Sequence, residues 1–217
     1  MSITPMPDFQ PLSEGIHLSA LDAYAGKPGA LEGVSFWPRA AARLVDSAVD
    51  YMMGRCSGYI FGFLAILVIR ATHSRELLLA LRRVDMSIGL FFFSLLGGIA
   101  FHTICEGIHG STPGKLLFSL VVVQEDGKPC RMRSALIRSL GYFVDALFFG
   151  LIGYLNMQKS PQQQRHGDEW AHTVVCKRST VAPENLRGIG TFVATLLLAA
   201  MANIALLMSG LLIQIVG

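Results

Sequence analysis

The sequence predicts an all-α integral membrane protein with three to four transmembrane helices and a small cytosolic β-hairpin or strand element. Of its 217 residues, 52% are hydrophobic and only 15% are charged. An ordinary soluble domain carries about 25% charged residues. The chain also contains four apolar segments, separated by polar stretches, that are long enough to cross the roughly 30 Å hydrocarbon layer as helices.

Charge and cysteine content argue against several classes of protein. The formal net charge of +3 is small and dispersed, so we do not expect nucleic acid as a partner. No Gly-x-Ser-x-Gly elbow and no His-Glu-x-x-His helix is present, and we expect neither an enzyme nor a cofactor or metal site. Four cysteines without close pairing are interpreted as reduced thiols: Cys56, Cys105, Cys130 and Cys176.

The chain divides into three regions by composition. Residues 1–35 are interpreted as a polar or interfacial arm, because they contain no apolar run long enough for a secretory signal. Residues 36–177 are expected to form the membrane domain. Residues 178–217 contain a last apolar segment over 188–216, which predicts a C-terminal transmembrane helix.

The first apolar segment, residues 43–69, begins with an unusual run of charges. Arg39, Arg43, Asp46 and Asp50 follow one another at steps of four, three and four, which places them on one face of a helix. A helix over 43–69 would rise roughly 40 Å, more than the hydrocarbon layer requires. We therefore expect the charged end to lie near one interface and to face an ion, a buried partner or a water-filled cleft.

A short interfacial helix over 70–83 and a second span over 85–106 are predicted next. His102, Glu106 and His109 lie three to four residues apart at the end of this span, and we interpret them as a polar helix end that meets water. Lys115 follows in a turn. It is expected either to contact lipid phosphates or to be a solvated flanking residue.

Residues 116–123 are rich in valine and leucine and predict a short strand, which an Asp-Gly turn over 124–129 reverses. A second valine-rich piece over 173–176 is a candidate partner. If the two pair, both lie on the same side of the membrane.

Between these two pieces, residues 134–157 form a third apolar segment. Arg138 and Asp145 are seven residues apart and share a helix face. Glycines within the segment leave two alternatives open, a single span or a broken, re-entrant helix. Lysine and arginine flank every apolar segment, so they do not orient the chain.

Four motifs, taken in order, give the chain a resemblance to the RDD family of bacterial membrane proteins over about residues 36–177. The run Phe36-Trp37-Pro38-Arg39 with Ala42-Arg43-Leu44-Val45-Asp46 is similar to the opening motif of the family. The loop Thr112-Pro113-Gly114-Lys115 and the strand after it, Arg138, and the closing run Gln164 to Val175 with Asp168 are similar to the others. Members of the family often have glycine where this chain has His172.

The resemblance implies a multi-pass protein of the bacterial inner membrane, in a family where some members are linked to cation/proton exchange. The charged side chains then form either an ion path or a structural cluster, and in both cases we expect an arginine partner for Asp46. Asp50 and Asp145 are the candidates for exchange. The cluster residues are Arg39, Arg43, Asp46, Asp50, Arg138 and Asp145, and the residues of the family motifs are Thr112, Pro113, Gly114, Lys115 and Asp168.

The first functional hypothesis is transport of a small cation or solute through this cluster, by a homo-oligomer or together with another membrane protein. The alternative is a non-transporting adaptor or assembly factor. A transporter should have a cavity that reaches Asp46, Asp50 or Asp145, whereas an adaptor should bury these carboxylates completely.

Overall fold

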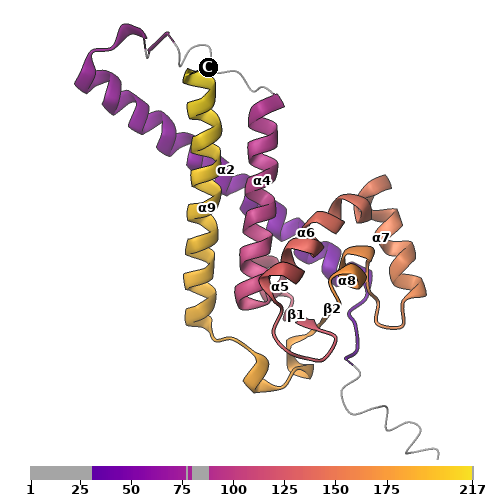
Figure 1. The fold of residues 1–217 in the computed structure, drawn as a ribbon. Coiled ribbons are helices and arrows are strands. Elements are labelled where there is room, and N and C mark those ends of the chain that lie inside the picture. Colours follow the sequence, from indigo (N-terminus) through magenta and orange to yellow (C-terminus); the bar gives the residue numbers. More distant parts are fainter. Residues whose placement is uncertain (1–30, 77, 80–87, 217) are drawn as a thin grey trace, which may run out of the picture. The chain divides into compact units, whose positions relative to one another are not determined.

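The computed structural model describes residues 31–76, 78–79 and 88–216 (Figure 1). Most of the arm predicted at 1–35 and part of the connection predicted over 70–83 lie outside these ranges. Within them, three helices are long and apolar enough to cross a membrane, and a bent helix pair is a candidate for a fourth crossing. A two-stranded antiparallel sheet accompanies them. The predicted fold class is confirmed.

Helix α2 spans Phe36–Thr72, which is longer at both ends than predicted. Its 37 residues rise about 55 Å, well beyond the thickness of a hydrocarbon layer. Its four buried residues are Arg39, Ala42, Asp46 and Ser57, so the buried face of its first part is polar. Its later part exposes large apolar side chains such as Phe63 and Ile66, as expected of a surface that faces lipid.

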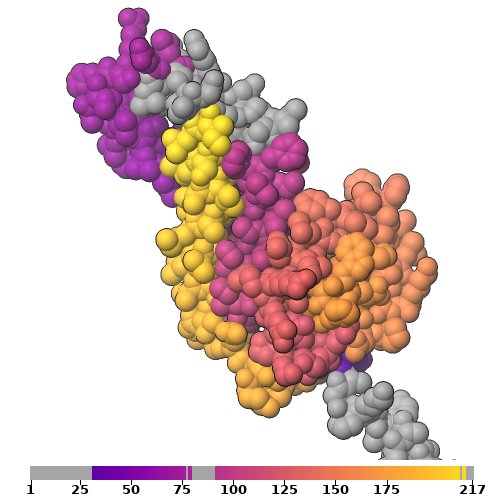
Figure 2. All heavy atoms as spheres, viewed as in Figure 1, coloured from indigo at the N-terminus to yellow at the C-terminus, as the bar shows by residue number. Residues whose placement is uncertain are grey.

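Helix α4 (Ile88–Ile104) continues into the π-helical turn η1 (Cys105–His109) and packs along α9 (Ile189–Val216), which runs in the opposite direction (Figures 1 and 2). Two glycines make this packing close. A Cβ on Gly97 would lie 2.8 Å from Asn203 Nδ2, and one on Gly210 would lie 2.6 Å from the ring of Phe93. Small residues at such crossings let transmembrane helices approach each other.

Strand β1 (Leu120–Gln124) pairs antiparallel with β2 (Thr173–Lys177), with Val122 opposite Val175. The predicted pairing is confirmed, but the predicted start of the first strand at 116 is wrong. Residues 116 and 117 belong to helix α5 (Pro113–Leu117). Thr112 caps this helix, since its side chain accepts a hydrogen bond from the backbone N–H of Lys115, and Pro113 fits the first helical position.

The sheet determines how the third apolar segment is arranged. Because β1 and β2 pair, α6 (Met132–Asp145) and α7 (Leu147–Lys159) must leave and return on one side of the membrane. The chain bends by 113° at the break between the two helices. Each rises only about 20 Å, too little to cross alone. The segment is therefore a broken helix pair, and the pairing of the strands favours a re-entrant hairpin over a single span.

Short elements complete the chain between the hairpin and the last helix. Helix α8 (His166–Trp170) packs on α6, where a Cβ on Gly141 would lie only 2.5 Å from the Cα atom of Gly167. The 3₁₀ turns η2 (Arg178–Thr180) and η3 (Pro183–Asn185) then lead from β2 to α9.

Candidate functional site

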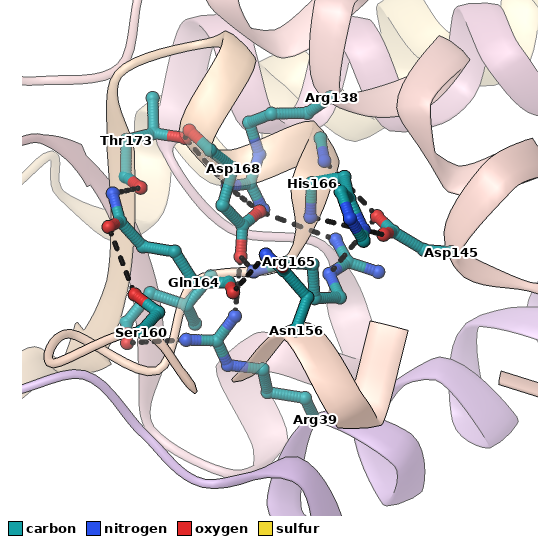
Figure 3. Close-up of polar contacts among 12 residues, drawn as sticks. Arg39, Arg138, Asp145, Asn156, Ser160, Gln164, Arg165, His166, Asp168 and Thr173 are labelled. Atoms are coloured by element: carbon teal, nitrogen blue, oxygen red, sulfur yellow. Dashed lines mark hydrogen bonds and ion pairs between the residues drawn. The ribbon is translucent and has the colours of Figure 1, made fainter. Parts of the chain in front are cut away.

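Asp168, fully buried in the first turn of α8, joins three elements (Figure 3). Its Oδ2 accepts a hydrogen bond from Arg39 of α2 at 2.6 Å, and its Oδ1 accepts one from Arg138 of α6 at 2.5 Å. The backbone N–H of Arg165 also donates to it, at 3.2 Å. The carboxylate thus holds the opening, middle and closing motifs together.

The arginines around Asp168 decide its charge. Burial alone would raise the pKa of Asp168, but the positive charges of Arg138, Arg165 and Arg39 outweigh burial and hold the pKa well below its usual range. Asp168 therefore stays ionised at neutral pH. It is suited to fixing the arginines and unsuited to carrying protons.

Glu106 is the second buried carboxylate of the cluster. Its Oε2 accepts a hydrogen bond from Arg138 Nε at 2.9 Å, and its Oε1 accepts one from Lys115 Nζ. The sequence-based interpretation of the end of α4 as meeting water is wrong, since His102, Glu106 and His109 are all buried. The polar residues there face α2, α6 and α9 instead.

Lys115 is neither a lipid contact nor a solvated flanking residue, because its amine is buried against Glu106. Burial lowers the pKa of Lys115, although the negative charge of Glu106 opposes this effect. No pattern in the sequence indicates this pair, because the two residues belong to different elements and their packing is a matter of tertiary structure.

Asp46 has no arginine partner within the described ranges, which contradicts the prediction. Its Oδ2 accepts a hydrogen bond from the hydroxyl of Thr112 at 2.6 Å, and its Oδ1 accepts one from the backbone N–H of Gly114 at 2.7 Å. A Cβ on Gly114 would overlap the carbonyl oxygen of Ala42. The Thr-Pro-Gly-Lys loop therefore docks on α2 through Asp46, and only glycine allows the approach.

Asp145 has a similar anchoring position at the end of α6. It accepts hydrogen bonds from the backbone N–H groups of His166 and Gly167, at 3.1 and 3.3 Å, and also contacts the ring of His166 (Figure 3). Its side chain is buried and is not part of the cavity described next. Its position is that of a residue that holds the start of α8.

A cavity of about 330 Å³ lies between α2, α4, α6 and α9. It reaches Asp46 and Asp50, as the transport hypothesis requires. Charged and titratable side chains line one part of it: Arg39, Arg43, Asp46, Asp50, His102, Glu106, Lys115, Arg138 and Arg165. Apolar residues line the remainder, among them Phe91, Leu95, Ile99 and Leu207.

His102 brings together two of the charged residues of α2, Arg43 and Asp50, on the wall of this cavity. Its Nε2 contacts Nη1 of Arg43 and lies 3.3 Å from Oδ2 of Asp50. The guanidinium of Arg43 also lies over the ring of Tyr142, 4.3 Å from its centroid. One ring nitrogen either donates or accepts, so it cannot accept from Arg43 and donate to Asp50 at the same time. Which contact is made depends on where the proton resides.

Four contributors to the cluster were not predicted as site residues: His102, Glu106, Tyr142 and Arg165. The spacing of His102 and Glu106 puts them on one face of the second span. That face could have been predicted to pack against the charged face of α2. Arg165 lies inside the closing motif, but no pattern in the sequence indicated that it would belong to the site. Among the residues that the structure describes, no group of three histidine, cysteine or acidic side chains is arranged to hold a metal ion.

Comparisons with known proteins agree with the motifs. The sequence pattern of the RDD family matches residues 34–172, about two thirds of the chain. The match contains the opening run, the Thr-Pro-Gly-Lys loop and Asp168. The boundaries expected for the membrane domain, after residues 35 and 177, are not tested by it and remain predictions. Searches of the curated proteins and of the solved structures found no match. The chain therefore belongs to the RDD family.

Proposed function

We propose that the protein moves a small ion or solute across a membrane in exchange for protons, with Asp50 and His102 as the groups that carry the proton. The observation that supports this proposal is the single nitrogen of His102 that Arg43 and Asp50 share at the cavity wall. Asp50 is the carboxylate suited to this role. Its side chain is 24% exposed, whereas that of Asp145 is 2% exposed.

Two proton positions give two arrangements of this group. With the proton on Asp50, Nε2 of His102 carries no hydrogen and accepts from Arg43. With the proton on His102, the nitrogen donates to the ionised Asp50 and releases Arg43. Proton transfer therefore changes which charge is free to meet a solute in the cavity. This is the differential contact that an exchange mechanism needs.

The charge of the cavity bears on the kind of solute. Five basic side chains line it against three acidic ones, so a bare cation meets a net positive wall even when Asp50 is ionised, and a more positive one when Asp50 is protonated. This balance favours a solute that carries a negative group over a small cation. Since three spans are few for a complete path, we also propose that the protein self-associates or works with another membrane protein.

We further propose that the side of the membrane with the sheet faces the cytosol. The basic flanks do not orient the chain from the sequence alone, but the hairpin topology gathers the ends of β1, α7 and β2 on one side. Their exposed or half-exposed flanks are rich in basic residues, and cytoplasmic loops carry an excess of lysine and arginine. These residues are Lys128, Arg131, Arg133, Lys159, Lys177, Arg178 and Arg187.

Reconstituted vesicles with a trapped pH-sensitive dye test the exchange. Sodium or lithium pulses, and separately small organic anions, should change the internal pH with the wild-type protein and not with Asp50→Asn or His102→Gln. Asp126→Asn removes a carboxylate from an exposed ion pair with Lys128 and serves as the matched control. Exchange by Asp50→Asn at the wild-type rate would contradict the proposal.

The adaptor hypothesis remains the second candidate, and the fully satisfied carboxylates Asp46 and Asp168 favour it. In that case every cluster variant should change the stability of the protein, and neither the wild type nor any folded variant should give a dye response.

A further inference from the structure

Arg43 differs from the other basic side chains of the cavity. Arg39, Arg138, Arg165 and Lys115 each pair with a carboxylate. Within the described residues Arg43 has no carboxylate partner; it meets only a histidine nitrogen and the face of a tyrosine ring, and its buried Nε has no hydrogen-bond partner. A guanidinium carries five N–H donors in a planar fork that suits carboxylate and phosphate oxygens. Arg43 thus presents unused donors and a surplus positive charge to the cavity.

The cavity changes from charged to apolar along α4. Glu106 and His102 line its charged end, and Ile99, Leu95 and Phe91 follow toward the beginning of the helix. Phe91 lies eleven positions before His102, a rise of about 16 Å. This is about half the roughly 30 Å hydrocarbon layer, the depth of one leaflet. A ligand that follows this wall has a polar group at one end and an apolar group at the other.

The opposite wall and the opening agree with such a ligand. Asn203 and Leu207 of α9 line the cavity one helical turn apart, and the buried Oδ1 of Asn203 has no hydrogen-bond partner in the part of the chain that the structure describes. Phe91 and Ser94 are exposed, so the apolar end is open to the surroundings of the helices. At about 330 Å³ the cavity is at the small end of ligand sites, which span roughly 300–1,000 Å³. It has room for a head group and the first part of a chain.

We propose that this cavity binds an amphiphile whose phosphate head group carries a net negative charge. Arg43 contacts the phosphate oxygens through two of its N–H groups, as arginine does in bidentate phosphate contacts. The hydrocarbon chain follows α4 past Leu95 and leaves beside Phe91 and Ser94 into the bilayer. The head group lies on the side of the sheet, the orientation that a phospholipid of that leaflet already has. This site does not depend on the proton exchange proposed above.

Binding is tested on the full chain in neutral detergent, by thermal unfolding and by native mass spectrometry. The probes are phosphatidic acid, phosphatidylcholine with the same acyl chains, and inorganic phosphate alone. Phosphatidic acid should raise the unfolding midpoint and remain bound. The change Arg43→Gln should weaken this binding at least tenfold. Arg55→Gln is the matched control, because Arg55 is exposed on the same helix, contacts Tyr51 and Tyr59, and does not line the cavity.

A second variant keeps the test decisive if Arg43→Gln fails to fold. Ser94→Trp fills the mouth of the cavity from an exposed position, so it should abolish binding and leave the unfolding midpoint without lipid unchanged. The proposal is overturned if Arg43→Gln or Ser94→Trp binds phosphatidic acid as tightly as the wild type. Equal binding of phosphatidylcholine would also overturn it, as would inorganic phosphate that reproduces the whole effect without a chain. No ion gradient is involved, so these results are independent of the transport measurement.

Discussion

At the scale of single residues, the buried carboxylates divide the work of the cluster. Asp46 and Asp145 anchor neighbouring backbone, with N–H groups of Gly114, His166 and Gly167 as donors. Asp168 fixes two arginines. Among the residues that the structure describes, Asp50 contacts only His102, and its buried Oδ1 has no hydrogen-bond partner there. The same residue type therefore serves as a structural joint at three positions and remains available for chemistry at one.

The change Asp168→Asn should lower the free energy of unfolding by about 3–5 kcal/mol, because it leaves Arg39 buried without a counter-charge and removes one of the two carboxylates that pair with Arg138. Thermal unfolding in mild detergent measures this loss. Asp126→Asn again provides the control, since its pair is exposed and such pairs contribute at most about 1 kcal/mol. Equal losses in the two variants would contradict the structural role of Asp168.

The pH dependence of stability follows from the same residue. The pKa of Asp168 is lowered in the folded state, so the unfolded chain binds the proton more tightly. The stabilisation is complete above the unfolded value of about 3.9 and is lost as the pH falls below it. The wild type should lose stability below about pH 4 more steeply than Asp168→Asn.

The sequence was informative about which residues are buried and less so about their partners. The helical spacing of Arg39, Asp46 and Asp50 predicted a polar face on α2, and the structure buries the first two of these. Spacing along one helix contains no information on the residues of other elements. The prediction of an arginine for Asp46 was wrong for this reason, since a loop 66 residues later supplies a hydroxyl and a backbone N–H instead.

At the scale of elements, helix α5 depends on one glycine. The change Gly114→Ala should destabilise the protein by about 1–3 kcal/mol or more, because the new Cβ would overlap the backbone carbonyl of Ala42, which cannot move aside as a side chain would. Gly58→Ala on α2 is the control, since no atom of the described residues lies within 4 Å of a Cβ there. Unfolding midpoints of the two variants give the comparison, and a Gly114→Ala protein as stable as the control would refute the close docking.

The apolar pattern of the sequence predicted the long helices better than it predicted where the short elements begin. The long spans were predicted well, because an uninterrupted apolar run of about 20 residues is typical of a membrane-spanning helix. The strand that was predicted to begin at 116 started too early, because valine and leucine suit a strand and a buried helix alike. The cap at Thr112 and Pro113 in the first turn were the signals that would have corrected it.

At the scale of the whole membrane domain, pairing of β1 with β2 requires both ends of the α6–α7 hairpin to lie on one side. Cysteines added one at a time to a Cys56→Ser background, in which the remaining cysteines 105, 130 and 176 are buried, test this with a membrane-impermeant maleimide applied to oriented vesicles. Arg131→Cys and Lys159→Cys flank the hairpin and should be labelled from the same side, and Thr72→Cys at the end of α2 from the opposite side. Labelling of the two flanking positions from opposite sides would show that the segment crosses the membrane.

The long-range contacts of α2 have a consequence for how the protein is made. Asp46 finds its partners 66 and 68 residues later in the chain, and Arg39 finds Asp168 only 129 residues later. Domains emerge from the ribosome amino end first. An unpaired charge at the bilayer centre costs about 2.5–3.5 kcal/mol. We therefore expect the charged first half of α2 to stay at the membrane–water interface during synthesis. Its ion pairs and hydrogen bonds can form only after α8 and β2 have been translated.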